Sequence, residues 1–115
     1  MTPRRQRETD PVGNFEEQVL LAVLRVGDDA YGMNVRREIE AVTGRSVTIG
    51  SVYVTLDRLE AKGLVSSARV AASGASSRRI FTVTTPGRLA LAETKALHER
   101  LWRGVKLQLA RGSSS

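Results

Sequence analysis

The sequence contains no cysteine and only one histidine, His98, among its 115 residues. Without cysteine there are neither disulfides nor thiolate metal ligands. A single histidine supplies too few ligands for a zinc site and no base beside a nucleophile. The glycines stand at expected helix ends and turns, not in the GxGxxG or GxxxxGK patterns of phosphate-binding loops. We therefore expect no enzymatic activity, no metal and no cofactor.

Long apolar runs are also missing. No stretch approaches the ~18 residues of a membrane-spanning helix, and the basic N-terminus has no hydrophobic segment behind it as a signal peptide would. We expect a single-domain cytoplasmic protein that does not enter a membrane. Lysine and arginine number 18 against 12 acidic residues, a net charge of +6. This excess favours a polyanionic partner, although charge alone also suits an anionic membrane surface.

The most informative stretch runs from Thr48 to Gly63. Thr48 can cap the start of a helix, and Gly63 suits the left-handed residue that ends one. Helical spacing predicts a buried stripe of four apolar residues, Ile49, Val52, Leu56 and Leu59. The residues predicted on the opposite side are Gly50, Ser51, Val54, Thr55, Arg58 and Lys62. Small side chains permit close approach to base edges in a major groove, and the two basic ones can reach phosphates; an ordinary packed helix is the alternative.

Two further helices are predicted before this stretch. The first covers residues 14–26, with Asn14 as its N-cap and Glu17 as the capping partner. Asp28 and Asp29 open a turn, and either can cap the second helix, which continues to about Thr43. Only residues 45–47 then separate it from the third helix. Two helices joined by a short turn, the later one with a small polar front, form the helix-turn-helix pattern.

A β-hairpin is predicted after the third helix. Residues 64–70 and 78–84 have the composition of strands, and a loop of small residues joins them. Three basic residues flank this loop: Arg69, Arg78 and Arg79. They can follow a phosphate backbone, or they can simply keep the hairpin edge from aggregating. A hairpin directly after a helix-turn-helix is the arrangement of a winged helix.

The final predicted helix begins at Thr85 as N-cap, with Pro86 in the first helical position, and continues to about Ala110. Its apolar side is too long for one small domain to cover, so we expect a second copy of the chain to cover part of it. The predicted dimer contacts are Leu91, Leu97, Leu101, Trp102 and Val105. Trp102 can also flank a small aromatic effector. A two-fold dimer would place two reading helices on half-sites about 34 Å apart.

Six short motifs occur in order between residue 14 and about residue 90. They are Asn14-Phe15-Glu16-Glu17, Ala30-Tyr31-Gly32, Arg36-Arg37-Glu38-Ile39, Gly50-Ser51-Val52-Tyr53, Leu56-Asp57-Arg58-Leu59-Glu60 and Lys62-Gly63-Leu64-Val65. Together they resemble the PadR family of bacterial transcriptional regulators, in its short form with a single C-terminal helix. The resemblance implies a winged-helix DNA-binding domain, a dimerisation helix, and a repressor relieved by a small molecule or stress signal. It also implies that Ser51, Tyr53 and Arg58 face DNA.

These observations predict a mainly α fold with a small β-hairpin, a winged helix-turn-helix followed by a dimerisation helix. The expected parts are a flexible basic arm (1–12), the winged-helix domain (13–85), the dimerisation helix (86–110) and a disordered tail (111–115). The predicted contacts to double-stranded DNA are Arg37, Thr48, Gly50, Ser51, Tyr53, Val54, Thr55, Arg58, Lys62, Arg78 and Arg79. The predicted function is sequence-specific transcriptional regulation by a homodimer. The alternative is an adaptor whose winged helix binds a protein, without specific DNA binding.

Overall fold

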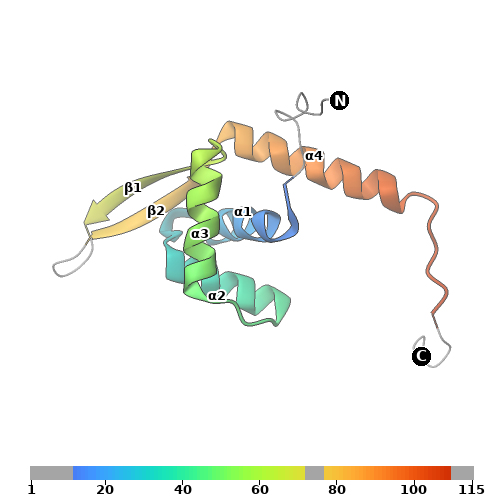
Figure 1. The fold of residues 1–115 in the computed structure, drawn as a ribbon, viewed down its shortest axis with the longest axis horizontal. Helices are drawn as coiled ribbons and strands as arrows, with labels where there is room; N and C mark the ends of the chain where they lie inside the picture. Colours follow the sequence, from blue (N-terminus) through green and yellow to red (C-terminus); the bar gives the residue numbers. More distant parts are fainter. Residues whose placement is uncertain (1–11, 72–76, 110–115) are drawn as a thin grey trace.

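The computed structural model describes residues 12–71 and 77–109 of the chain (Figure 1). Their elements are α1 (Asn14–Val26), the 3₁₀ turn η2 (Gly27–Asp29), α2 (Gly32–Thr43), α3 (Ile49–Ala61), β1 (Val65–Ala71), β2 (Ser77–Val83) and α4 (Thr85–Trp102). Figure 1 shows α1, α2 and α3 gathered in one body, the hairpin projecting from one side and α4 leading away on the other. The predicted mainly α fold with one hairpin is confirmed. The predicted tail, and the predicted arm except residue 12, lie outside the described residues.

One hydrophobic core joins the first three helices to the hairpin. Its largest fully buried side chains from the helices are Val19, Leu20, Val35, Val52, Leu56 and Leu59. The antiparallel register pairs Val65 with Val83 and Ser67 with Phe81. Because directly opposite residues lie on the same face of a hairpin, one face carries all three buried apolar residues and closes the core. The backbone N–H of Phe81 also donates to the carbonyl of Ala30 at 2.9 Å, which fixes the hairpin to the segment before α2.

The starts of the first two helices differ from the prediction. Gly13, and not Asn14, is the N-cap of α1, so Glu16 stands at the third helical position. Its Oε1 accepts a hydrogen bond from the backbone N–H of Gly13 at 3.3 Å, the role that we predicted for Glu17. The prediction that Asp28 or Asp29 caps the second helix is also wrong, because Tyr31 is the N-cap of α2. Residues 27–29 form η2 instead, and α2 begins only at Gly32.

The start of α4 is set by a contact between distant residues. Thr84, and not the predicted Thr85, is the N-cap, because its Oγ1 accepts from the N–H of Gly87 at 3.1 Å. The same hydroxyl donates to the carbonyl of Gly63 at 2.7 Å. The hydroxyl of Thr84 thus bonds the first turn of α4 and the glycine that follows α3, and so holds the start of α4 against the end of α3.

The end of α4 is also earlier than predicted. The helix ends at Trp102 and does not reach residue 110. Gly104 adopts φ +78°, a left-handed conformation that glycine accepts readily and that stops a right-handed helix. The N–H of Val105 donates to the carbonyl of Trp102 at 2.9 Å and closes the turn. The prediction of Val105 as part of a dimerisation helix is therefore wrong, because it lies in the non-helical segment that follows.

At Gly87, α4 passes very close to the base of the hairpin. Gly87 is buried, and a Cβ at this position would overlap the carbonyl oxygen of Leu64 and lie 2.7 Å from Cγ1 of Val83. The carbonyl of Leu64 accepts a hydrogen bond from the N–H of Thr84 at 3.0 Å. The backbone therefore cannot retreat without losing this bond. The lack of a side chain at residue 87 determines how α4 leaves the winged domain.

Substitution Gly87→Ala is expected to lower the free energy of unfolding by about 1–3 kcal/mol, the usual cost of overpacking. This loss should appear although alanine forms helices more readily than glycine. Urea denaturation followed by circular dichroism measures it. The control is Gly50→Ala, near the start of α3, where no atom lies within 4 Å of an added Cβ. The control should be as stable as the wild type or up to about 1 kcal/mol more stable. Unchanged stability of Gly87→Ala would contradict the close packing of Gly87 against Leu64 and Val83.

Candidate nucleic-acid interface

α3 presents one exposed stripe on the side opposite the core. Its exposed residues recur at helical spacing: Gly50, Ser51, Val54, Asp57, Arg58, Ala61 and Lys62. Val54, in the middle of this stripe, is 57% exposed, so the stripe carries an apolar side chain between its polar ones. Figure 1 shows α3 lying across the outside of α1, so that the helix is open along its length. We call this set of residues the α3 stripe.

The start of the stripe is small, polar and ordered. The predicted N-cap at Thr48 is confirmed: its Oγ1 accepts from the N–H of Ser51 at 3.1 Å. The hydroxyl of Ser51 donates to the carbonyl of Thr48 at 3.1 Å. Both side chains are exposed. Their oxygens therefore stand at fixed positions at the front of the helix, beside Gly50.

Two residues that we predicted on the outward side lie elsewhere. Thr55 is only 4% exposed, so the prediction that it contacts DNA is wrong. It stands three residues after Val52 and four before Leu59, and this spacing places it beside both buried residues. Asp57 takes the outward position, and the spacing of three from Val54 was the signal for it in the sequence. Tyr53 is half-buried, with its ring so close to the backbone of Gly32 that a Cβ there would overlap it.

The cations on the helix-turn-helix have different surroundings. In the described part of the chain, no carboxylate lies within ion-pair distance of Arg58. Arg37 is exposed on α2, where its Nη1 donates to Oδ1 of Asn34 at 3.2 Å. Lys62 instead pairs with Glu16, its Nζ lying 2.8 Å from Oε2. Burial raises the pKa of Glu16, but hydrogen bonds from Lys62 and the Gly13 N–H outweigh it and hold that pKa below its usual value. Lys62 therefore ties the end of α3 to α1.

The loop end of the hairpin, the segment before α2 and α3 border a hollow of about 300 Å³. It is lined by Tyr31, Tyr53, Arg69, Ser77, Arg78 and Arg79. The guanidinium of Arg78 lies 4.0 Å from the ring centroid of Tyr31, in cation–π distance. The fold thus brings the predicted residue Tyr53 of α3 together with all three arginines of the hairpin. The guanidinium groups of Arg69 and Arg78, with two phenols beside them, are suited to hold an anion.

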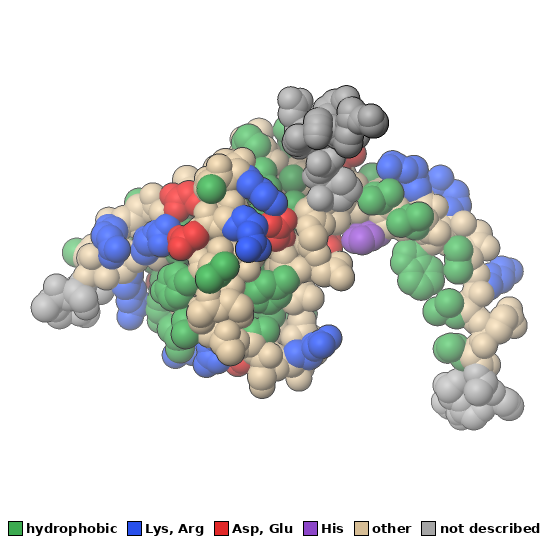
Figure 2. All heavy atoms as spheres, in the orientation of Figure 1, with side chains coloured by type: hydrophobic (Ala, Val, Ile, Leu, Met, Phe, Trp, Pro, Cys, Tyr) green, Lys and Arg blue, Asp and Glu red, His purple; other side chains and the backbone are tan. Residues whose placement is uncertain are grey.

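Arg79 differs from the other hairpin arginines because it is paired inside the protein. Its Nη2 lies 2.7 Å from Oε1 of Glu60 and 3.0 Å from Oδ1 of Asp57. Hydrogen bonds from Ser67 and Arg79 hold the pKa of Glu60 below its usual value. Figure 2 shows acidic and basic side chains interleaved where α3 meets the hairpin. No local pattern in the sequence indicates this cluster, because its members come from α3 and from both strands of the hairpin.

The predicted dimer contacts divide into two groups. Leu91 and Leu97 are half-buried, and Leu91 packs against the core of its own domain. The large apolar side chains at the end of α4 and beyond are all more than half exposed: Leu101, Trp102, Val105, Leu107 and Leu109. Figure 2 shows these hydrophobic side chains gathered away from the three-helix body. Part of α4 therefore belongs to the winged domain, and its end is an uncovered apolar surface.

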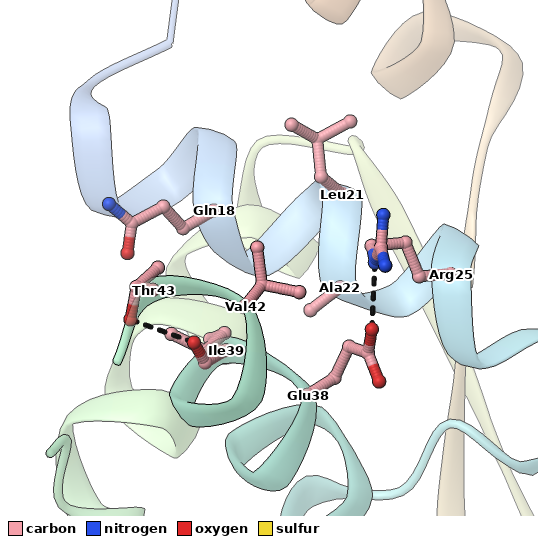
Figure 3. Close-up of a pocket in the computed structure, with 8 residues that line it drawn as sticks. All are labelled: Gln18, Leu21, Ala22, Arg25, Glu38, Ile39, Val42 and Thr43. Atoms are coloured by element: carbon pink, nitrogen blue, oxygen red, sulfur yellow. Dashed lines mark hydrogen bonds and ion pairs between the residues drawn. The ribbon is translucent and has the colours of Figure 1, made fainter. Parts of the chain in front are cut away.

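A second hollow, of about 210 Å³, lies between α1 and α2 (Figure 3). Its walls include the apolar side chains of Leu21, Ile39 and Val42. At one end Nε of Arg25 pairs with Oε2 of Glu38 at 2.7 Å. Within the described ranges no group of three or more His, Cys, Asp or Glu side chains could hold a metal ion. None of the described helices is long and apolar enough to cross a membrane.

Comparison with known proteins gives a consistent result. Residues 20–93 match the family model described as "Transcriptional regulator PadR-like family". The chain is 42% identical over 62 residues to the transcriptional regulator Rv3488 of Mycobacterium tuberculosis (strain ATCC 25618 / H37Rv), a match that covers 54% of this chain and 57% of that protein. The match thus spans just over half the length of this curated relative.

Solved structures share the fold. A PadR family transcriptional regulator from Eggerthella lenta DSM 2243 superposes with a TM-score of 0.62 at 27% identity, covering 75% of each chain. A PadR-like transcriptional regulator from Bacillus cereus strain ATCC 14579 gives 0.65 at 21% identity, covering 77% of this chain and 84% of the other. RosR of H. salinarum gives 0.66 at 22% identity, with coverage of 83% and 81%.

Proposed function

Because the chain belongs to the transcriptional regulator PadR-like family, we propose that it is a homodimeric, sequence-specific DNA-binding repressor. In this proposal a small molecule or a stress signal lowers its affinity for DNA. The family is one of transcriptional regulators and not of enzymes, in agreement with the expectation from the sequence. The observation that carries the proposal is the α3 stripe, an exposed helix side that is small at the front and basic farther along. Since its target is the chromosome, we place the protein in the cytoplasm.

In the proposed complex the front of α3 enters the major groove. Gly50 allows the backbone to approach base edges, and the hydroxyls of Thr48 and Ser51 can donate or accept hydrogen bonds there. Val54 offers an apolar surface to the methyl group of thymine. Arg58 then meets a phosphate on the side of the groove. Sequence preference would come from the front of the helix and most of the affinity from phosphate contacts.

The hollow beside α3 supplies a second phosphate contact. Arg69 and Arg78 line it from the hairpin, and Tyr53 lines it from α3. A phosphate of the strand that flanks the groove would find two cations and a phenolic donor there. Arg37, on the exposed side of α2, extends the basic surface. These contacts position the protein on DNA without reading its sequence.

We propose that the end of α4 forms the dimer interface. Leu101 and Trp102 lie next to each other in the chain, and each is more than half exposed. A two-fold axis near them would bring each patch against its copy and set the distance between the two reading helices. The indoles of the two Trp102 side chains would then lie close together. A flat aromatic effector between them would change the separation of the subunits. The two reading helices would then no longer fit their half-sites, and the affinity for DNA would fall.

An adaptor function remains the alternative, and the apolar hollow between α1 and α2 favours it. Leu21 and Val42, 41% and 56% exposed, present apolar surface there that a helix of a protein partner could cover. An adaptor would bind DNA weakly and with little dependence on sequence. The salt dependence of DNA binding separates the two functions.

The test is selection from a randomised duplex pool, followed by fluorescence anisotropy with the selected duplex at several salt concentrations. We expect a two-fold symmetric site and a log–log salt slope of about −0.9 for each phosphate contacted, with about three to five contacts per subunit. Arg58→Ala should weaken binding to all duplexes and reduce this slope by about 1 per subunit. Arg88→Ala, which removes the same charge from α4, is the control and should leave the slope nearly unchanged. Recovery of no preferred sequence would favour the adaptor.

A further inference from the structure

We propose that Arg79 is an internal counter-ion and not a phosphate contact. In this role it fixes the hairpin to α3 and offsets part of the negative charge of Asp57 and Glu60 beside the DNA interface. The inference rests on the proposed function, and it revises the prediction that Arg79 contacts DNA directly.

The guanidinium of Arg79 is occupied on several sides. Nη2 lies between the carboxylates of Glu60 and Asp57, at 2.7 and 3.0 Å. Nε donates to the hydroxyl of Ser67 at 3.3 Å, and this hydroxyl donates to the second oxygen of Glu60 at 2.8 Å. The planar group also lies 4.8 Å from the ring centroid of Phe81. A phosphate would have to displace hydrogen bonds to two carboxylates in order to reach it.

Exposure supports the same assignment. The side chain of Arg79 is 28% exposed, whereas that of Asp57 is 60% exposed. The cation is therefore on the inside of the cluster and a carboxylate on the outside. Asp57 belongs to the α3 stripe, directly before Arg58 in the chain. Without Arg79 the reading side of α3 would carry uncompensated negative charge beside the phosphates.

The register of the hairpin gives a second reason for the pairing. Arg69 on β1 stands directly opposite Arg79 on β2. Like charges at opposite positions of two strands destabilise their pairing. The carboxylates of α3 offset this repulsion by holding the charge of Arg79. The two arginines thus have different roles: Arg79 is paired with carboxylates of α3, whereas the described residues give Arg69 no such ion pair.

A double-mutant cycle on the full chain tests the proposal with the selected duplex. Arg79→Gln keeps an amide donor but removes the charge, and Asp57→Asn with Glu60→Gln removes the carboxylates. We expect Arg79→Gln to weaken binding about tenfold or more in the native chain, but about twofold or less when both carboxylates are already replaced. Arg79→Lys, which keeps the charge, should recover part of the loss. Equal losses in both backgrounds, with a salt slope reduced by about 1 per subunit, would show a direct phosphate contact and overturn the proposal.

Arg69→Gln is the matched control, because it removes the same charge from the opposite position of the hairpin. Its effect on DNA binding should be the same with and without the carboxylates. A second cycle, in urea denaturation, needs no DNA: Arg79→Gln should lower the denaturation midpoint of the native chain and not that of the chain lacking both carboxylates. If the wild type selects no duplex, the proposed function fails while this cycle still tests the counter-ion. If Arg79→Gln lowers the midpoint equally with and without the two carboxylates, the counter-ion proposal is overturned.

Discussion

Substitution Val54→Glu is expected to abolish sequence-specific DNA binding, with the affinity for the selected duplex falling at least about 100-fold. Val54 lies at the middle of the α3 stripe and is 57% exposed. In the proposed complex the new carboxylate would enter a groove walled by phosphates and lose its hydration. Like charges brought together at an interface cost several kcal/mol. Since each 1.4 kcal/mol is about a factor of ten, a loss of this size is expected.

The fold should tolerate this substitution. Val54 makes no part of the core, and glutamate is a better helix former than valine. Circular dichroism and the urea midpoint should therefore match the wild type while fluorescence anisotropy shows the loss of binding. Val42→Glu is the matched control, because Val42 is a valine of similar exposure, 56%, on α2. We expect this control to retain most of its affinity.

The two outcomes that contradict the proposal differ in meaning. Binding by Val54→Glu at wild-type strength would remove the α3 stripe from the DNA interface. Equal losses in both variants would point to a general effect of added negative charge, and no longer to insertion of α3 into a groove. In either case the adaptor becomes the better explanation of the exposed valines.

Substitution Leu101→Asp is expected to convert the proposed dimer into a monomer, weakening self-association at least about 100-fold. Leu101 is 65% exposed at the end of α4, beside the exposed Trp102. Two-fold symmetry buries the residue of both subunits, so each dimer would bury two carboxylates without partners. Burial of an unpaired charge costs several kcal/mol, and the carboxylate remains hydrated in the monomer. Sedimentation velocity over a range of protein concentrations measures the change.

Loss of the dimer should also lower DNA affinity. Two linked reading heads bind the second half-site at an effective concentration in the millimolar range, a gain of about 10²–10⁴ over one head. The monomer should lose this gain on the two-fold site and bind an isolated half-site as the wild-type subunit does. Leu89→Asp, at a residue of similar exposure, 62%, near the start of α4, is the control and should remain a dimer. If Leu101→Asp still forms dimers, the interface does not include the end of α4. The hollow of Figure 3 would then be the next surface to test.

Local sequence patterns were sufficient to predict the helices, the hairpin and their order. Helical spacing of Val52, Leu56 and Leu59 predicted the buried side of α3, and the hydroxyl of Thr48 predicted its cap. These features depend on residues within one or two turns of each other, so local physical chemistry decides them. The end of α4 is also decided locally, by the left-handed Gly104, although the prediction carried the helix past it to about residue 110. The six motifs also pointed to the family that the comparisons show.

Which charged residues are available to a partner depends on contacts between residues that are distant in the chain. Arg79 reaches Asp57 across 22 positions of the chain, and Lys62 reaches Glu16 across 46. Nothing in local spacing indicates such pairs, because they depend on how separate elements lie against each other. Composition counts every arginine and lysine as positive charge offered to DNA. The fold engages some of these cations with its own carboxylates, since a partly buried charge is stable only when it is paired, and leaves others, such as Arg58, on the surface.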